Sequence, residues 1–201
     1  MKVFQERFQM RVESNMALIK AQQVLGALFL FLLSSISAWA QTCNSAMPFT
    51  APDTRYTINS IGTVTDLHTG LMWQQCSAGL SGADCADGVV QSFKWDQALQ
   101  HVENLNATTG FANYTDWRLP NIKELVSLVE EACDSPAINL NHFPNTTHSK
   151  YWSSSPLIGQ YTTLAWYVRF YDGYSHNMSR SSDGFVRLVR IDHDLVSLIA
   201  N

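Results

Sequence analysis

The chain has 201 residues, of which 13 are Lys or Arg and 17 are Asp or Glu, so its formal net charge is −4 at pH 7. Four of the basic and two of the acidic residues precede position 41, so residues 41–201 carry nine basic and 15 acidic residues, a net charge of −6. Nucleic acids and anionic membranes favour basic surfaces. The charge therefore argues against nucleic acid as the main partner.

The N-terminal region has the pattern of a secretory signal peptide. An apolar run from Val24 to Leu33 is too short to span a bilayer, follows a positively charged flank and ends at the A-x-A sequence of residues 38–40. We expect a signal peptide over residues 1–40, cleavage after Ala40, a secreted or periplasmic location and no membrane span after cleavage. Met16 is an alternative start, and an uncleaved anchor is the alternative to cleavage.

Residues 41–201 suit a single domain, because no low-complexity stretch marks a linker. We divide them into an N-terminal segment (41–58), a domain (59–194) and a C-terminal tail (195–201), and we interpret Asp192 to Asp194 as solvated. Four cysteines in an exported chain favour disulfides over metal ligation. Three pairings are possible. We favour Cys76–Cys85, which closes a short Gly- and Ser-rich loop, together with Cys43–Cys133.

Two short β-prone runs begin the domain, at residues 62–66 and 71–74, and their turn residues predict paired strands. Ser92 is then a candidate N-cap for a first helix, whose apolar positions continue at helical spacing to Leu105. The stretch from Asp116 to Leu125 predicts an extended arm that turns sharply into a second helix, because Pro120 disfavours helix before it.

The second predicted helix runs from Asn121 to Cys133. Asn121 is its candidate N-cap, and Glu124 three residues later completes a capping box. Beyond Cys133 the pattern changes to strands separated by Asp-Gly turns, a strong hairpin signal. The expected strands and turns are 151–155, 163–171, the turn 172–173, 174–180, the turn 183–184 and 185–191.

This order of elements predicts an α+β domain in which two helices pack on a mainly antiparallel twisted sheet. The chain has no βαβ alternation and no Gly-rich phosphate loop, so a Rossmann or P-loop nucleotide-binding domain is excluded. The six histidines are dispersed without ligand spacing, so we predict no metal and no cofactor. Ser153 to Ser155 lack the surroundings of a nucleophile elbow, which favours a structural role.

Five segments in this order resemble the Lcl C-terminal domain family, over about residues 60 to 191. They are residues 69–74, 116–125, 151–155, 165–168 and 186–190. The resemblance implies an exported bacterial domain of C-type-lectin-like topology, related to the formylglycine-generating and sulfatase-modifying enzymes and to the terminal domain of a collagen-like adhesin. It implies no established catalytic activity.

The catalytic and calcium-binding features of those relatives do not carry over. The formylglycine-generating enzymes use cysteines late in the domain, whereas no cysteine follows Cys133 here, and Phe143-Pro144-Asn145 keeps only part of a lectin calcium triplet. We interpret the family motifs as structural, with Arg118 fixed by a carboxylate and at least one of Arg187 and Arg190 in an internal ion pair. The residues of these motifs are Trp73, Trp117, Arg118, Pro120, Trp152, Trp166 and Arg190.

A candidate ligand surface comes from alternation along the strand that begins at Ala165. Trp166, Val168 and Phe170 are expected on one face and the polar and aromatic side chains between them on the other, where sugar rings or anionic groups could bind. The alternative is a face covered by a loop or by the helices. The candidate ligand-binding residues are Tyr167, Arg169, Tyr171, Tyr174, His176 and Arg180.

The leading hypothesis is therefore a disulfide-bonded, exported, lectin-like module that binds a glycan or a surface protein without catalysis. A second hypothesis is an enzyme of altered chemistry on the sulfatase-modifying fold, which a buried cluster of Arg118, His176 and Asp183 would favour. A third is a structural subunit of a surface assembly, in which residues 41–57 form an interchain contact in an oligomer.

Overall fold

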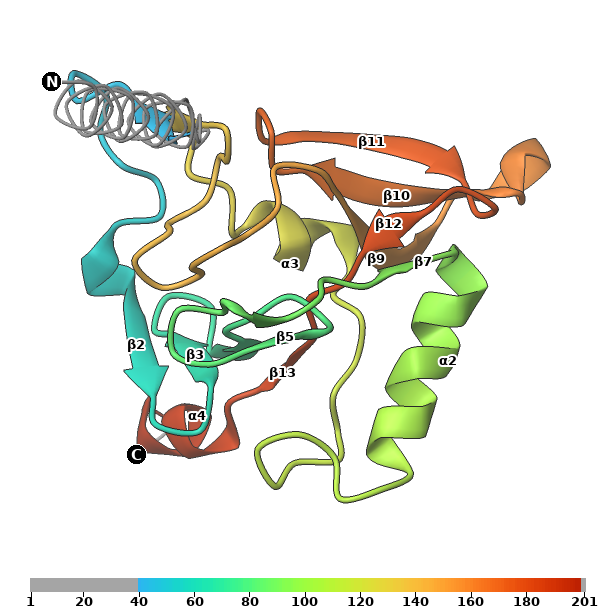
Figure 1. Ribbon diagram of the computed structural model, residues 1–201, viewed down its shortest axis with the longest axis horizontal. Helices are drawn as coiled ribbons and strands as arrows, with labels where there is room; N and C mark the ends of the chain where they lie inside the picture. The colour runs from blue at the N-terminus through green and yellow to red at the C-terminus, as the bar shows by residue number, and fades with distance from the viewer. Residues whose placement is uncertain (1–39, 200–201) are drawn as a thin grey trace, which may run out of the picture. The chain divides into compact units, whose positions relative to one another are not determined.

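The computed structural model describes residues 40–199, so residues 1–39 of the predicted signal peptide lie outside the described part. Figure 1 shows the elements in order along the chain. The strands are β1 (Thr42–Cys43), β2 (Tyr56–Asn59), β3 (Thr63–Asp66), β4 (Leu71–Gln74), β5 (Leu80–Ser81), β6 (Asp87–Gly88), β7 (Ser92–Phe93), β8 (Cys133–Asp134), β9 (Lys150–Pro156), β10 (Leu164–Arg169), β11 (Tyr174–Ser179), β12 (Gly184–Phe185) and β13 (Val189–Ile191). The helices are α2 (Trp95–Asn106), α3 (Ile122–Val126) and α4 (His193–Ile199), with short 3-10 turns η1 (Asp53–Arg55) and η2 (Gly159–Tyr161).

The strands form two main sheets and two small ribbons. One sheet has the order β11-β10-β9-β12-β7 and the other β13-β4-β3-β2, while β1 pairs with β8 and β5 with β6. Every pair is antiparallel except β12 with β9. The predicted α+β class with mainly antiparallel strands is therefore confirmed, but the predicted single sheet is replaced by two.

The division into two sheets arises where the last predicted strand splits. Its first part is β12 in the five-stranded sheet and its last part is β13 in the four-stranded sheet, and the three residues between them, Val186 to Leu188, are 0% exposed. The guanidinium of Arg187 donates hydrogen bonds to oxygens from both sides of this crossing. The acceptors are the carbonyls of Gln74 (3.0 Å) and Gln75 and the hydroxyls of Ser77 (3.3 Å) and Thr146 (2.7 Å).

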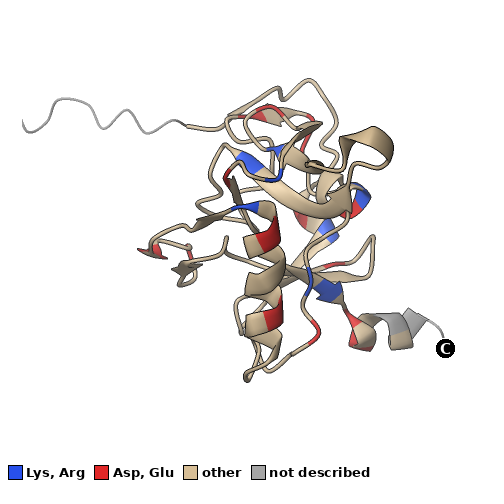
Figure 2. Ribbon diagram, turned by 90° about the vertical axis from the view of Figure 1, so that its right-hand side faces the viewer, with Lys and Arg blue, Asp and Glu red and all other residues tan. Residues whose placement is uncertain are grey.

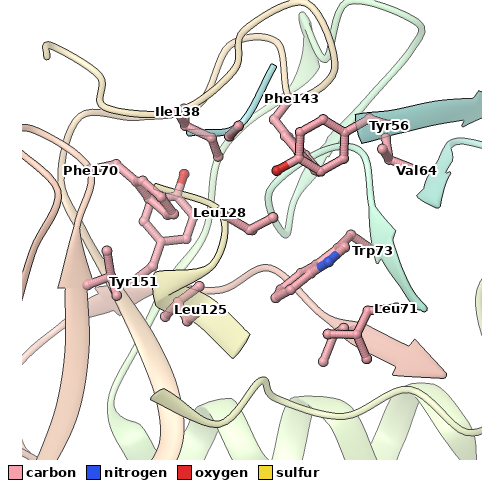
Figure 3. Packing of buried hydrophobic residues seen from close by; sticks show 13 residues of the cluster. Tyr56, Val64, Leu71, Trp73, Leu125, Leu128, Ile138, Phe143, Tyr151 and Phe170 are labelled. Atoms are coloured by element: carbon pink, nitrogen blue, oxygen red, sulfur yellow. The ribbon is translucent and has the colours of Figure 1, made fainter. Parts of the chain in front are cut away.

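Two apolar clusters fill the domain. The first surrounds Trp73 and joins the four-stranded sheet to α3 and to the aromatic side chains of Tyr151 and Phe170, as Figure 3 shows. The second surrounds Trp152 and packs α2 onto the five-stranded sheet through Trp95 and Ala98. Burying large aromatic side chains contributes about 2 kcal/mol or more each, so these clusters dominate the stability of the fold.

The first helix begins later than its sequence predicts. Ser92 is not its N-cap, because Ser92 and Phe93 pair with β12 as strand β7. The helix instead begins at Trp95, after Lys94, whose backbone N–H donates to the side chain of Gln97 (3.1 Å).

The second helix has the predicted start but ends early. Asn121 accepts from the backbone N–H of Glu124 (3.0 Å), and Glu124 accepts from that of Asn121 (2.7 Å), so the capping box is confirmed. The helix ends at Val126 rather than Cys133. The following residues turn because the buried carboxylate of Glu130 accepts backbone N–H groups from Thr50 (3.1 Å), Ala51 (2.7 Å) and Ala132 (3.0 Å).

The two predicted Asp-Gly turns have different outcomes. Asp172 and Gly173 connect the paired strands β10 and β11, as predicted. Asp183 and Gly184 form no hairpin, because β12 pairs with β7 and β9 and not with β11. Gly184 is needed there for another reason: a Cβ atom would lie 2.8 Å from the indole nitrogen of Trp152.

Both favoured disulfides, Cys43–Cys133 and Cys76–Cys85, are present. The predicted boundary between residues 58 and 59 falls inside β2, and residues 195–199 of the predicted tail are part of α4. The solvated interpretation of Asp192 is wrong. Its carboxylate is buried, accepts the hydroxyl of Thr65 (2.6 Å) and caps the backbone N–H of Leu195 (3.1 Å).

We predict that Asp66 makes the fold sensitive to acid. Burial alone would raise the pKa of Asp66, but hydrogen bonds from Arg55 (2.8 and 2.5 Å) and from the Thr69 hydroxyl (2.7 Å) outweigh it and lower that pKa below 3.8. A lowered pKa adds stability that is present above the unfolded-state pKa and is lost as the pH falls through the folded-state pKa. Asp66→Asn should therefore lose about 2–3 kcal/mol of unfolding free energy at pH 7 and much less at pH 2.

Urea unfolding at both pH values measures this difference. Asp183→Asn is the control, because Asp183 is exposed and should tolerate the change. Equal losses for Asp66→Asn at pH 7 and pH 2 would contradict the assignment.

Candidate functional site

The predicted ligand face is formed by the pairing of β10 with β11. Tyr167 lies opposite His176 and Arg169 lies opposite Tyr174, so these four side chains share one face of the sheet. Lys150 of β9 lies opposite Arg169 and joins them. We call Lys150, Tyr167, Arg169, Tyr174 and His176 the β10–β11 face.

Tyr167 forms the floor of this face rather than a free contact residue. Its side chain is only 9% exposed and belongs to the cluster around Trp152. The ammonium of Lys150 lies 5.6 Å from the centroid of the Tyr167 ring, within cation–π range, and the His176 ring lies 6.3 Å away. A ligand on this face would therefore contact Lys150 and His176 before it reached Tyr167.

Arg169 is held by a neighbouring carboxylate. Its Nε donates to Asp172 (2.9 Å), and a second bond from its guanidinium completes a two-pronged ion pair. The hydrogen bond to Asp172 raises the pKa of Arg169. Burial opposes ionisation of Asp172, but the bond from Arg169 outweighs it and lowers the pKa of Asp172. Arg169 is thus oriented, and part of its charge is neutralised.

The exposed members of the face are Lys150, Tyr174 and His176. Tyr174 is 69% exposed, the most exposed large aromatic side chain of the face. The Nδ1 atom of His176 is 2.9 Å from the carbonyl of Asn177, so in that contact Nδ1 carries the proton and donates. Tyr171 lies just past β10 and is 44% exposed, with its ring 6.4 Å from that of His148.

Arg180 does not join the β10–β11 face. It lies six residues beyond Tyr174, a distance of about 20 Å along an extended strand. Its guanidinium stacks over the Trp95 ring (4.2 Å), and its Nε donates to the carbonyl of Leu164 (3.3 Å). The structure therefore brings together four of the six predicted ligand residues, Tyr167, Arg169, Tyr174 and His176, and leaves Arg180 at the other end of the sheet.

Lys150 is the residue of this face that the sequence did not reveal. It directly precedes Tyr151, and its place depends on the pairing of β9 with β10. Alternation within one strand gives the face of a residue, but only the register between strands gives its neighbours.

Most of the family motif residues lie in the interior of the domain. Trp73, Trp117 and Trp152 are at most 2% exposed, Leu119 and Pro120 are buried, and Trp166 is half-buried and borders a hollow beside α3. Arg190 is 6% exposed, pairs with Asp116 (2.7 Å) and stacks over Tyr114 (3.7 Å). Arg190 thus supplies the predicted internal ion pair.

Arg118 is bound by its own local structure. Both of its terminal nitrogens donate to Glu124 (2.7 Å each), the residue that also caps α3. His176 and Asp183 are exposed, so these three side chains form no buried polar cluster of the kind that would favour an enzyme of altered chemistry. Within residues 40–199, no three His, Cys, Asp or Glu side chains are grouped to hold a metal ion.

The charges of the described residues form no broad basic tract. Figure 2 shows short, separated basic bands and acidic bands on α2. No helix in the described part has the length and apolar content required to cross a bilayer.

The fold is an α+β, disulfide-bonded domain with an aromatic and cationic group on one sheet. The model of the Lcl C-terminal domain family matches residues 62–190, which is more than half of the chain. The chain therefore belongs to the Lcl C-terminal domain family. A comparison with curated proteins gives no match.

We predict that two motif arginines differ sharply in their effect on stability. Arg118→Ala should lower the unfolding free energy by about 1 kcal/mol or less, because its ion pair with Glu124 is partly exposed and screened. Arg187→Met should cost about 3 kcal/mol or more, because four buried oxygen acceptors lose their donor. Urea unfolding of both variants measures their losses of unfolding free energy. Similar losses would show that burial of the arginine does not determine its contribution to stability.

Proposed function

We propose that this protein is an exported, non-catalytic binding module that recognises a glycan at a bacterial surface or in the periplasm through the β10–β11 face. The observation that carries the proposal is Tyr174, a 69% exposed aromatic ring on the same sheet face as three cationic or titratable side chains. Aromatic rings stack on the apolar faces of sugars, and Lys and Arg side chains bind their anionic substituents.

The export part of the proposal is supported by the cysteines. All four are paired in disulfides, which persist in oxidising compartments such as the periplasm and the cell exterior. The signal-peptide pattern of residues 1–40 agrees with this location.

We also propose that the fold is C-type-lectin-like and related to the formylglycine-generating enzymes. Supporting features are the corner from Arg118 to Pro120 before α3, the late segment from Gly184 to Arg187 and the two disulfides. Those enzymes depend on late cysteines, and no cysteine follows Cys133 here. This difference favours binding over thiol oxidation.

We predict that Tyr174→Ala and His176→Ala each weaken glycan binding about tenfold, because each removes a contact worth roughly 1–2 kcal/mol. The protein is expressed from its full sequence and exported by the host. A glycan array then identifies the ligand, and titration calorimetry measures the dissociation constant of that glycan for each variant. Neither change should alter the fold, because both side chains are exposed.

Tyr161→Ala is the matched control, since Tyr161 is a 52% exposed tyrosine in η2, outside the β10–β11 face. Its binding should equal that of the unchanged protein. Binding that survives both Tyr174→Ala and His176→Ala would reject this face as the site. If the array showed no glycan binding and a pull-down captured a protein only when Tyr174 was intact, the ligand of this face would be a protein and not a glycan.

A further inference from the structure

A large cavity lies apart from the β10–β11 face. Its volume is about 700 Å³, and it is bounded by the turn between β2 and β3, by the loop that Cys76–Cys85 closes and by the second half of α2. None of its lining residues belongs to the β10–β11 face. Small-molecule sites typically have volumes of about 300–1,000 Å³, so the cavity has the size of a ligand site.

Apolar side chains form the rim and much of the walls of this cavity. Ile58 and Ile61 form an exposed rim, with 48% and 43% of their surface accessible to solvent. Leu80, Leu105 and Phe111 are half-buried in its walls. Exposed isoleucines at the mouth of an apolar cavity mark a surface whose burial by a ligand would be favourable.

The lining contains no Asp, Glu, Lys or Arg. His101 is its one titratable side chain, and burial lowers the pKa of this imidazole below 6.5, so it is neutral at pH 7. The cavity therefore offers no charge to a ligand, and it would strip water from a charged ligand without compensation.

Three of the polar side chains in the lining already have partners inside the protein. The Gln74 side-chain oxygen accepts from the backbone N–H of Leu188 (3.4 Å), and the Gln75 amide donates to the carbonyl of Ala83 (3.4 Å). The Ser77 hydroxyl bonds to that of Tyr151 (2.7 Å). These groups are therefore engaged within the protein and are less available to a polar ligand.

The walls are also fixed in place before any ligand arrives. The disulfide and the β5–β6 pairing brace the loop, and the backbone N–H of Gln75 donates to the carbonyl of Gly62 in the opposite turn (3.0 Å). The Phe111 ring packs edge-on against Trp117, with centroids 5.7 Å apart. A preformed site loses little conformational entropy on binding.

We propose that this cavity is a second binding site, which takes a neutral, largely apolar small molecule with an aromatic or alicyclic body. The absence of charge from the lining determines the charge of the ligand, and the isoleucine, leucine and phenylalanine walls determine its apolar character. The site is independent of the glycan-binding proposal, because the two share no residue.

The probe is N-phenyl-1-naphthylamine, a neutral dye whose fluorescence rises in apolar surroundings, titrated into the exported protein at pH 7. We expect saturable binding of one dye per chain. Ile58→Asp and Ile61→Asp should each weaken binding tenfold or more, because each places a carboxylate at the rim of the cavity. Both isoleucines are exposed, so near-ultraviolet circular dichroism should stay unchanged.

Two controls make the test specific. Ile158→Asp introduces the same charge at an 84% exposed isoleucine outside the cavity lining and should bind the dye like the unchanged protein. The dye 8-anilino-1-naphthalenesulfonate has the same aromatic body with an added sulfonate and should bind at least tenfold more weakly.

Three results would overturn the proposal. The first is no saturable binding of the neutral dye, and the second is equal binding of the neutral and sulfonated dyes. The third is unchanged binding after Ile58→Asp and Ile61→Asp. None of these results bears on glycan binding, which is measured separately through Tyr174.

Discussion

The burial of one arginine is the constraint on which the two-sheet architecture depends. Arg187 lies where the chain leaves one sheet for the other, 0% exposed, and its guanidinium lies 5.0 Å from the centroid of the Phe143 ring. Within residues 40–199 no carboxylate pairs with it, and burial lowers its pKa to about 10, so it remains a cation at neutral pH. Carbonyl and hydroxyl oxygens accept from its two terminal nitrogens, while its buried Nε has no hydrogen-bond partner in the described part of the chain. The segments that supply these oxygens must converge, and that convergence sets β4 against the end of the chain.

The same convergence explains why the proposed binding sites lie at the margins of the domain. The two aromatic clusters take Trp73, Trp152 and Tyr167 into the interior, so the middle of the predicted ligand strand is a floor rather than a surface. What remains accessible is the end of the sheet around Tyr174 and the separate cavity beside α2. The fold thus separates a polar, aromatic face from an apolar cavity, and the two differ in the chemistry they can recognise.

Features set by neighbouring residues could be predicted from the sequence, and features set by distant partners could not. The capping box of Asn121 and Glu124 and the Asp172–Gly173 hairpin turn depend on residues within four positions. The early end of α3 depends on Glu130, whose bonds to Thr50 and Ala51 span about 80 positions. The spacing of apolar residues in the predicted helix gives no indication of that contact.

The candidate site follows the same rule. Alternation placed Tyr167 and Arg169 on one face, because a strand has a fixed period of two. The sequence could not reveal that Lys150 lies over Tyr167, nor that Trp95 holds Arg180 away, since both contacts join separate elements. The split of the last strand was equally hidden, because Val186 and Leu188 flank Arg187 with the same alternation that a continuous strand would have.

The Cys43–Cys133 bond has a mechanical consequence if the chain is pulled from its N-terminal side, as the proposed surface location would allow. Tension applied to the chain before residue 43 passes through this covalent link to Cys133 and does not travel along the 90 positions between the two cysteines. The six strands from β2 to β7 and the cavity within that stretch are therefore shielded from a pull on the N-terminal side. Such a pull would instead act on β8 and the later strands, among them β10 and β11. The tension would therefore act on the sheet that carries the proposed ligand site.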